Sequence, residues 1–132
     1  MTTRTLVLIA AVLGFTGVAL GAFGAHGLES TLEANDRTGT YQTASEYHVY
    51  HALALLGVAW LTDRTGTGSA GRRWAARAGM ALTAGVVIFS GSLYVLAIAD
   101  LGFMGAVAPI GGALLLAGWA ALGYAAWLIW AD

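Results

Sequence analysis

The chain contains no cysteine, which excludes a disulfide framework, thiol catalysis and a thiolate metal site. Charged residues are also scarce, because Asp, Glu, Lys and Arg make up only 10% of the 132 residues, against about 25% in a soluble domain. The formal net charge of −1 argues against a nucleic-acid partner. A chain with so few charges cannot cover a water-facing globule, so we expect lipid to be its main solvent.

What the chain has in abundance is apolar sequence, with 58% hydrophobic residues and a mean hydropathy of +0.74. About 20 consecutive apolar residues suffice to cross a bilayer as a helix. Four segments approach that length and predict an all-α, four-helix transmembrane bundle that forms a single integral-membrane domain over residues 1–132. The predicted spans are approximately 5–25, 44–62, 74–99 and 105–130.

The longest polar stretch, residues 28–45, separates the first two spans. Leu28 and Leu32 lie four residues apart and predict a short amphipathic surface helix. Asn35-Asp36 and Gly39 predict a turn, with Thr40 or Thr43 as the cap of the next helix. Because a span that starts at His48 would be short, the second span is expected to begin earlier, as far back as Tyr41.

The charged residues sort to two sides of the predicted bundle. With four spans, both termini and the middle loop share one side, and the first and third connections share the other. Five of the six basic residues fall on the first side: Arg4, Arg64, Arg72, Arg73 and Arg77. Five of the seven acidic residues fall on the second: Glu29, Glu33, Asp36, Glu46 and Asp100. The positive-inside rule therefore predicts both termini in the cytoplasm (N-in, C-in) and the amphipathic helix outside.

Polar side chains from the second and third spans are predicted to meet the end of the first span at one depth, in the outer leaflet. On a helix, Tyr47, His48 and His51 share one face. Polar groups within spans are costly and often mark a site. The predicted ligand-binding cluster is His26, Glu46, Tyr47, His48, Tyr50, His51, Ser90, Ser92 and Tyr94.

This cluster has several interpretations. His26, His48 and His51 could ligate a divalent metal, or two histidines from different helices could hold a b-type haem. The same side chains could bind a quinone, a lipid headgroup or a small amphiphile. They could also serve only as interface anchors that bond to loop carbonyls. An oligomeric channel or transporter is a third class, although no span carries an arginine, lysine or carboxylate at mid-depth.

Glycine lies at positions that favour close helix packing in lipid. Gly14, Gly17, Gly21 and Gly24 form a stripe along the first span, and these predicted packing positions are joined by Gly91, Gly111 and Gly112. The stripe predicts a homo-oligomer that associates through its glycine faces. None of these glycines belongs to a phosphate-binding loop, because they lie inside predicted apolar helices and no lysine follows them.

Four motifs occur along the chain in a fixed order: GAFGAHGL at 21–28, YHALAL at 50–55, FSGSLY at 89–94, and PIGG at 109–112 followed by Gly118-Trp119. Together they resemble the YgdD/YwdK family of small bacterial inner-membrane proteins (DUF423, a domain of unknown function). The resemblance covers essentially the whole chain and implies a multi-pass protein of the bacterial inner (plasma) membrane, with no known activity.

His26 and His51 fall on histidine positions of this family's pattern. His48 lies where glutamine is expected about as readily, Glu46 lies where glutamine is usual, and Ala108 replaces a common threonine. The resemblance therefore favours a polar cluster in which His26 and His51 bond across the first two spans. Our interpretation is a protein without enzymatic activity or an obligatory cofactor. It is expected to bind a ligand, membrane lipid or protein partner, as a homo-oligomer or as a subunit of a membrane complex.

Overall fold

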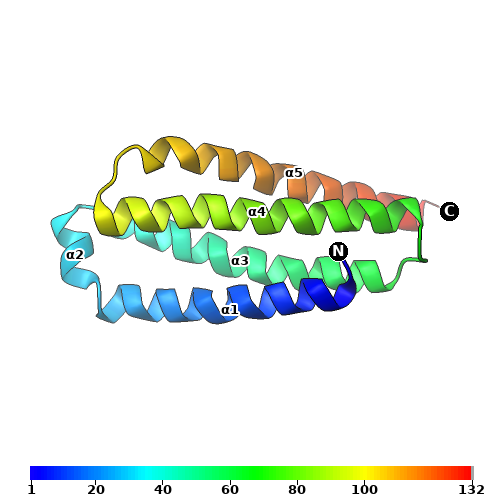
Figure 1. Ribbon diagram of the computed structural model, residues 1–132, viewed down its shortest axis with the longest axis horizontal. Helices are drawn as coiled ribbons and strands as arrows, with labels where there is room; N and C mark the ends of the chain where they lie inside the picture. The colour runs from blue at the N-terminus through cyan, green and yellow to red at the C-terminus, as the bar shows by residue number, and fades with distance from the viewer. Residues whose placement is uncertain (132) are drawn as a thin grey trace.

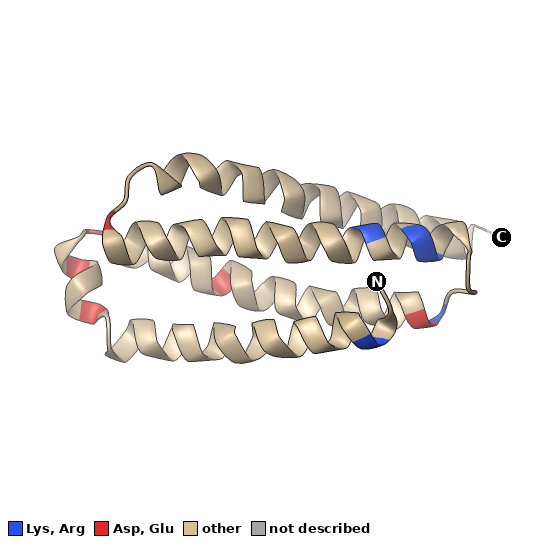
Figure 2. Ribbon diagram, in the orientation of Figure 1, with Lys and Arg blue, Asp and Glu red and all other residues tan. Residues whose placement is uncertain are grey.

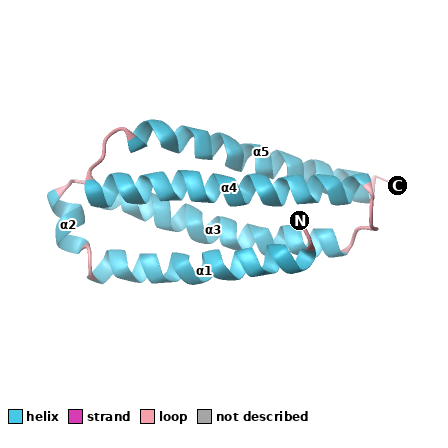
Figure 3. Ribbon diagram, in the orientation of Figure 1, coloured by secondary structure: helices cyan, strands magenta, loops and turns pink. Residues whose placement is uncertain are grey.

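The computed structural model describes residues 1–131, which form five helices and, within that range, no strand (Figures 1 and 3). The helices are α1 (Thr3–His26), α2 (Glu29–Ala34), α3 (Thr38–Asp63), α4 (Ala70–Ala99) and α5 (Met104–Trp130). The prediction of an all-α chain is therefore confirmed, and each predicted span lies inside one long helix.

The four long helices lie side by side, and α2 crosses the end of the molecule between α1 and α3 (Figure 1). The closely packed pairs are α1 with α3, α3 with α4, and α4 with α5. The largest core cluster draws on all four long helices: Leu6, Ala10, Leu55, Val58, Ala59, Leu82, Val86 and Leu115. Because α4 packs against both α3 and α5, a groove between α3 and α5 has α4 as its floor.

The outer surface of the bundle is apolar. Phe15 is 77% exposed and Leu116 is 74% exposed, and burying such side chains in lipid is favourable. Within residues 1–131, α1, α4 and α5 are long and apolar enough to cross a membrane. Helix α3 is equally long, but the first half of its sequence is polar.

Most basic residues lie at one end of the bundle and most acidic residues lie at or toward the other, with one acidic position part-way along α3 (Figure 2). The arginines of α4 lie in its first turns, beside the two termini, whereas α2 and the α4–α5 turn carry acidic side chains. Arg37 is at the acidic end, where its Nε lies 3.2 Å from Oδ1 of Asp100. Asp63 is at the basic end. The two ends therefore differ in charge as the sequence predicted.

Helix α3 begins at Thr38, six residues before the predicted start of the second span. Asp36 adopts a positive φ of 54°, so the chain reverses within residues 35–37 and enters α3 at once. The predicted turn at Asn35-Asp36 is present, but the predicted caps at Thr40 and Thr43 are wrong, because both residues lie inside α3. Thr43 instead donates its hydroxyl hydrogen bond to the carbonyl of Gly39, 3.0 Å away.

Three glycines of the α1 stripe pack against α3. A Cβ added at Gly17 would lie 2.9 Å from Val49, one at Gly21 would lie 3.1 Å from Ser45, and one at Gly24 would overlap the ring of Tyr41. The prediction of close packing holds for these three positions. Gly17, Gly21 and Gly24 are covered by α3 of the same chain, so these three positions are not open to a second copy, and the homo-oligomer itself stays a prediction.

The other predicted packing glycines divide into two kinds. A Cβ at Gly111 would overlap the backbone of Phe89, and one at Gly112 would make ordinary contact with the Phe89 ring at 3.8 Å. Gly14 and Gly91 mediate no packing within the described chain, because a Cβ at either position would meet nothing within 4 Å. Gly14 lines an open groove between α1 and α3, which shows that glycine content alone does not determine which positions are tightly packed.

Candidate functional site

The two histidines of α3 lie near the middle of the bundle. His48 and His51 are 10 and 13 residues after Thr38, which at 1.5 Å per residue places them about 15 and 20 Å along a helix of about 39 Å. The sequence predicted both at the outer end of the span. Because α3 starts at Thr38, nearly two more helical turns precede them than the predicted span start at residue 44 allowed.

His51 bridges α3 to α5 through both of its ring nitrogens. It is 5% exposed, and its Nδ1 lies 2.7 Å from the carbonyl oxygen of Tyr47. A carbonyl only accepts hydrogen bonds, so Nδ1 carries the proton. The lone pair of Nε2 then accepts the indole N–H of Trp119 at 3.2 Å. His51 is therefore a neutral side chain whose acceptor nitrogen faces Trp119.

Beside this hydrogen bond lies a groove of about 600 Å³, the α3–α5 groove. Its lining residues are Tyr47, His51, Phe89, Pro109, Gly112, Ala113, Leu115, Leu116 and Trp119. The ring of Tyr47 lies 4.9 Å from that of Phe89 and 5.8 Å from that of His51, the latter pair only 29° from parallel. Ligand pockets typically measure about 300–1,000 Å³ and combine apolar walls with a few polar groups, and this groove has both properties.

A second group of polar side chains lies between α1, α3 and α4, where His48 and Tyr94 are buried and Thr16 is half-buried. The Thr16 hydroxyl donates to the carbonyl of Val12 at 2.8 Å, so its oxygen is free to accept the Nε2–H of His48 at 3.3 Å. Nδ1 of His48 then accepts the hydroxyl of Tyr94, also at 3.3 Å. This His48 network (Thr16, His48 and Tyr94) joins α1, α3 and α4, and its buried polar groups are satisfied by one another.

The two serines of the FSGSLY motif make no bond between helices among the described residues. Ser92 donates to the carbonyl of Phe89 in its own helix at 2.9 Å. Ser90 is 1% exposed, and its hydroxyl has no hydrogen-bond partner within residues 1–131. Neither serine therefore links two helices within residues 1–131, because the hydroxyl of Ser92 bonds to its own helix and that of Ser90 has no partner there.

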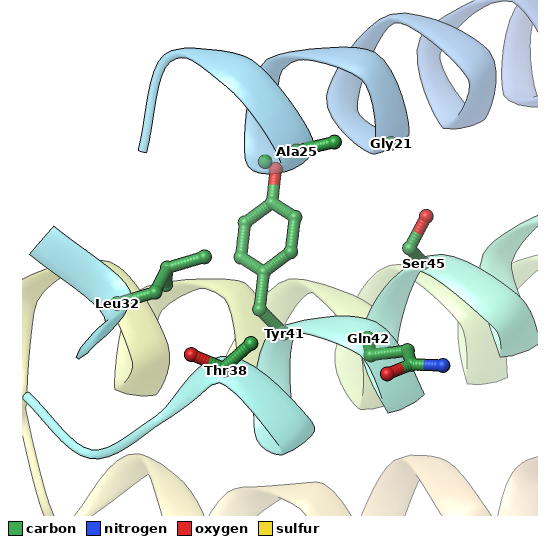
Figure 4. A pocket seen from close by; sticks show the side chains of 8 residues that line it. Gly21, Ala25, Leu32, Thr38, Tyr41, Gln42 and Ser45 are labelled. Carbon is green, nitrogen blue, oxygen red and sulfur yellow. The ribbon is translucent and has the colours of Figure 1, made fainter. Parts of the chain in front are cut away.

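A smaller pocket of about 250 Å³ lies at the acidic end, between α1, α2 and α3 (Figure 4). The ring of Tyr41 points across it toward α1, where its hydroxyl donates to the carbonyl of Leu20 at 2.6 Å. Thr38, Gln42 and Ser45 contribute the other polar side chains from α3. None of these residues was among the predicted site residues.

The remaining predicted site residues lie on the surface, away from both histidines of α3. His26 is the exposed last residue of α1, and Tyr50 is 57% exposed. Glu46 is exposed and accepts a hydrogen bond from the amide of Gln42 at 2.9 Å. The predicted nine-residue cluster is therefore wrong as one site: Tyr47 and His51 line the α3–α5 groove, and His48, Ser90, Ser92 and Tyr94 are interior.

The predicted three-histidine metal site is also wrong. Across the described part of the chain, no three His, Asp or Glu side chains gather where they could share an ion. His48 faces α1 and α4, whereas His51 faces α5. Gly17 lies level with His48, so His26, nine residues further along α1, is about 14 Å away along the bundle axis. The predicted bond between His26 and His51 fails for the same reason, and so does an axial pair for haem, which needs two histidines at one level.

Comparison with known proteins gives the family. A family model described as "Protein of unknown function (DUF423)" matches residues 20–112. The chain is similar to the UPF0382 inner membrane protein YgdD of Escherichia coli (strain K12), with 44% identity over 120 residues, 91% of this chain and 87% of the relative. It is also similar to the UPF0382 membrane protein YwdK of Bacillus subtilis (strain 168), with 38% identity over 117 residues, 88% of this chain and 90% of the relative. No solved structure matches.

The chain belongs to the DUF423 family. The resemblance inferred from the four motifs is therefore confirmed. Both relatives are named as membrane proteins, and three helices of this chain can cross a membrane, which confirms the predicted multi-pass inner-membrane location. The DUF423 match contains Tyr47, His51 and Phe89 from the α3–α5 groove, but it ends before Trp119.

Trp119 is the site residue that sequence reasoning on this DUF423 member missed. Tryptophans in membrane proteins gather at the two interfaces, and the other four, Trp60, Trp74, Trp127 and Trp130, lie toward the basic end. Trp119 is eleven residues from Trp130 on the same helix, about 17 Å away along its axis. A tryptophan this far from the end of its helix was the feature of the sequence that could have indicated a site residue.

Proposed function

We propose that this chain is a four-helix transmembrane bundle with both termini in the cytoplasm. Helix α3 qualifies as the fourth span because the polar residues at its middle, His48 and His51, are turned inward, while Leu53, Leu56 and Trp60 are exposed. The arginines at the end of the bundle that carries the termini support the orientation through the positive-inside rule.

The orientation can be tested directly, because the chain has no native cysteine. We expect a membrane-impermeant maleimide to label Glu33→Cys, on the exposed surface of α2, in intact cells. Thr67→Cys, in the turn between α3 and α4, should be labelled only after the membrane is permeabilised. Labelling of Thr67→Cys alone in intact cells would reverse the proposed orientation.

Within this frame, the function is the binding of a membrane-soluble amphiphile in the α3–α5 groove, without catalysis. The observation that carries the proposal is the hydrogen bond between His51 and Trp119 at the wall of the groove. Both ring nitrogens of His51 are hydrogen-bonded, and α4 already packs against both α3 and α5, so the main helix contacts do not depend on the bond between His51 and Trp119. A neutral acceptor at mid-depth, beside an open groove with aromatic walls, suits an amphiphile that partitions into the bilayer.

The experiment is to identify what the purified protein carries. Ala113 is exposed and lines the groove, so Ala113→Trp should fill it, while Ala84→Trp, exposed on α4 outside the groove, is the matched control. We expect one class of extractable amphiphile to be enriched on the wild type and the control, and reduced about tenfold in Ala113→Trp, the equivalent of about 1.4 kcal/mol of binding. Equal amounts on all three proteins would contradict the proposal.

A further inference from the structure

The polar groups of the α3–α5 groove indicate which chemical class of amphiphile it binds. Resting on the proposed function, we propose that its ligand is a lipid-soluble phenol or quinol. The ring hydroxyl of the ligand replaces the indole of Trp119 as the hydrogen-bond donor to Nε2 of His51.

The first step is the tautomer of His51. The bond from Nδ1 to the carbonyl of Tyr47 is short, at 2.7 Å, and lies within one turn of α3, so it stays in place whatever enters the groove. The proton is therefore fixed on Nδ1, and Nε2 of the neutral ring offers only a lone pair. A ligand at this position must donate a hydrogen bond to leave no buried polar atom unpaired.

The second step is that Trp119 can give way. Its bond to His51 measures 3.2 Å, at the long end of the usual range, and its side chain is half exposed. Its outward neighbour Leu116 is 74% exposed, so the indole can turn toward lipid without displacing packed side chains. The side chain of His51, 5% exposed, has no such freedom.

The third step is the shape of the groove. The rings of Tyr47, Phe89 and His51 lie 4.9 and 5.8 Å apart around one wall, which favours a flat aromatic head that can stack or pack edge-on. Ala113, Leu115 and Leu116 line the rest and suit a hydrocarbon tail. The groove offers no arginine or lysine, so an anionic phosphate head would find no charged partner here.

The test compares two probes that differ only in the donor: 4-dodecylphenol and its methyl ether, 4-dodecylanisole. Binding to the full-length protein in detergent is measured by equilibrium dialysis. The emission of Trp119 in a variant with Phe at the other four tryptophans is the second readout. We expect the phenol to bind about tenfold more tightly than the ether and to shift the Trp119 emission. In His51→Phe, which keeps a ring but lacks Nε2, the two probes should bind alike.

Equal binding of both probes to the wild type would overturn the phenol or quinol class while leaving the groove as a binding site. Binding of neither probe would overturn this inference together with the proposed function. Phenol binding that persists in Ala113→Trp would place the probe elsewhere and also overturn the inference. Because the comparison of the two probes on the wild type decides the matter, the test stands even where His51→Phe fails to fold.

Discussion

Gly111→Ala is expected to lower the free energy of unfolding by about 3 kcal/mol, at the upper end of what overpacking costs. A Cβ at Gly111 would overlap the backbone nitrogen and Cα of Phe89. Backbone atoms cannot rotate aside as a side chain does, so α5 must move away from α4 along its length. The loss is measured as a lower midpoint of unfolding, followed by helical circular dichroism during titration of the detergent-solubilised protein with sodium dodecyl sulfate.

The neighbouring glycine provides the control. In Gly112→Ala the new methyl group would lie 3.8 Å from the Phe89 ring, an ordinary contact, and in Gly91→Ala it would meet nothing within 4 Å. The free energy of unfolding of both variants should lie within about 1 kcal/mol of the wild-type value or slightly above it, because alanine favours a helix over glycine by about that amount. If Gly111→Ala were as stable as Gly112→Ala, α4 and α5 would not approach each other as closely as described.

Helix ends that depend on a few adjacent residues could be predicted from the sequence. The first helix ends at His26, with Gly27 as its cap, one residue beyond the predicted end of the first span at residue 25. The turn predicted at Asp100–Met104 lies between α4 and α5, and Asp100 adopts a left-handed backbone with φ 50°. These features depend on a few adjacent residues and on turn chemistry, so the chain alone determines them.

The start of α3 could not be predicted in the same way. Its first turns carry Gln42, Ser45 and Glu46, which resemble a loop by composition. They are helical because Tyr41 inserts against Gly24 of α1 and donates to the carbonyl of Leu20. That contact joins residues far apart in sequence, so local polarity placed His48 and His51 nearer to the start of the helix than they lie.

The candidate site failed in prediction for a related reason. The prediction assumed that polar side chains at the same level of the bundle lie close together. The level of a residue along its helix does not determine which neighbouring helix its side chain faces. His48 and His51 differ by about 60° around α3, which is enough to point one at α1 and the other at α5. The partners Thr16 and Trp119 lie 32 and 68 residues away, and only the packing of the helices brings them into contact.

His48→Ala is expected to lower the free energy of unfolding by about 3 kcal/mol, through a buried cavity and the loss of two hydrogen bonds. Without the imidazole, the hydroxyl of Tyr94 is left buried without its acceptor. Tyr94→Phe removes only the donor and should cost about 1 kcal/mol. The two variants and their double mutant form a cycle, and we expect the double mutant to lose clearly less than the sum, because the two residues share one bond.

Ser90→Ala is the matched control in the same interior region. Its hydroxyl is buried and lacks a partner among the described residues, so removing the hydroxyl should leave stability unchanged or slightly raised. The ligand measurement then separates the two histidines. Because His48 is sealed between α1, α3 and α4, folded His48→Ala protein should keep its binding of 4-dodecylphenol, whereas His51→Phe should lose the preference for the phenol at near-normal stability. A loss of phenol binding in stable His48→Ala protein would instead show that the His48 network and the α3–α5 groove act as one site.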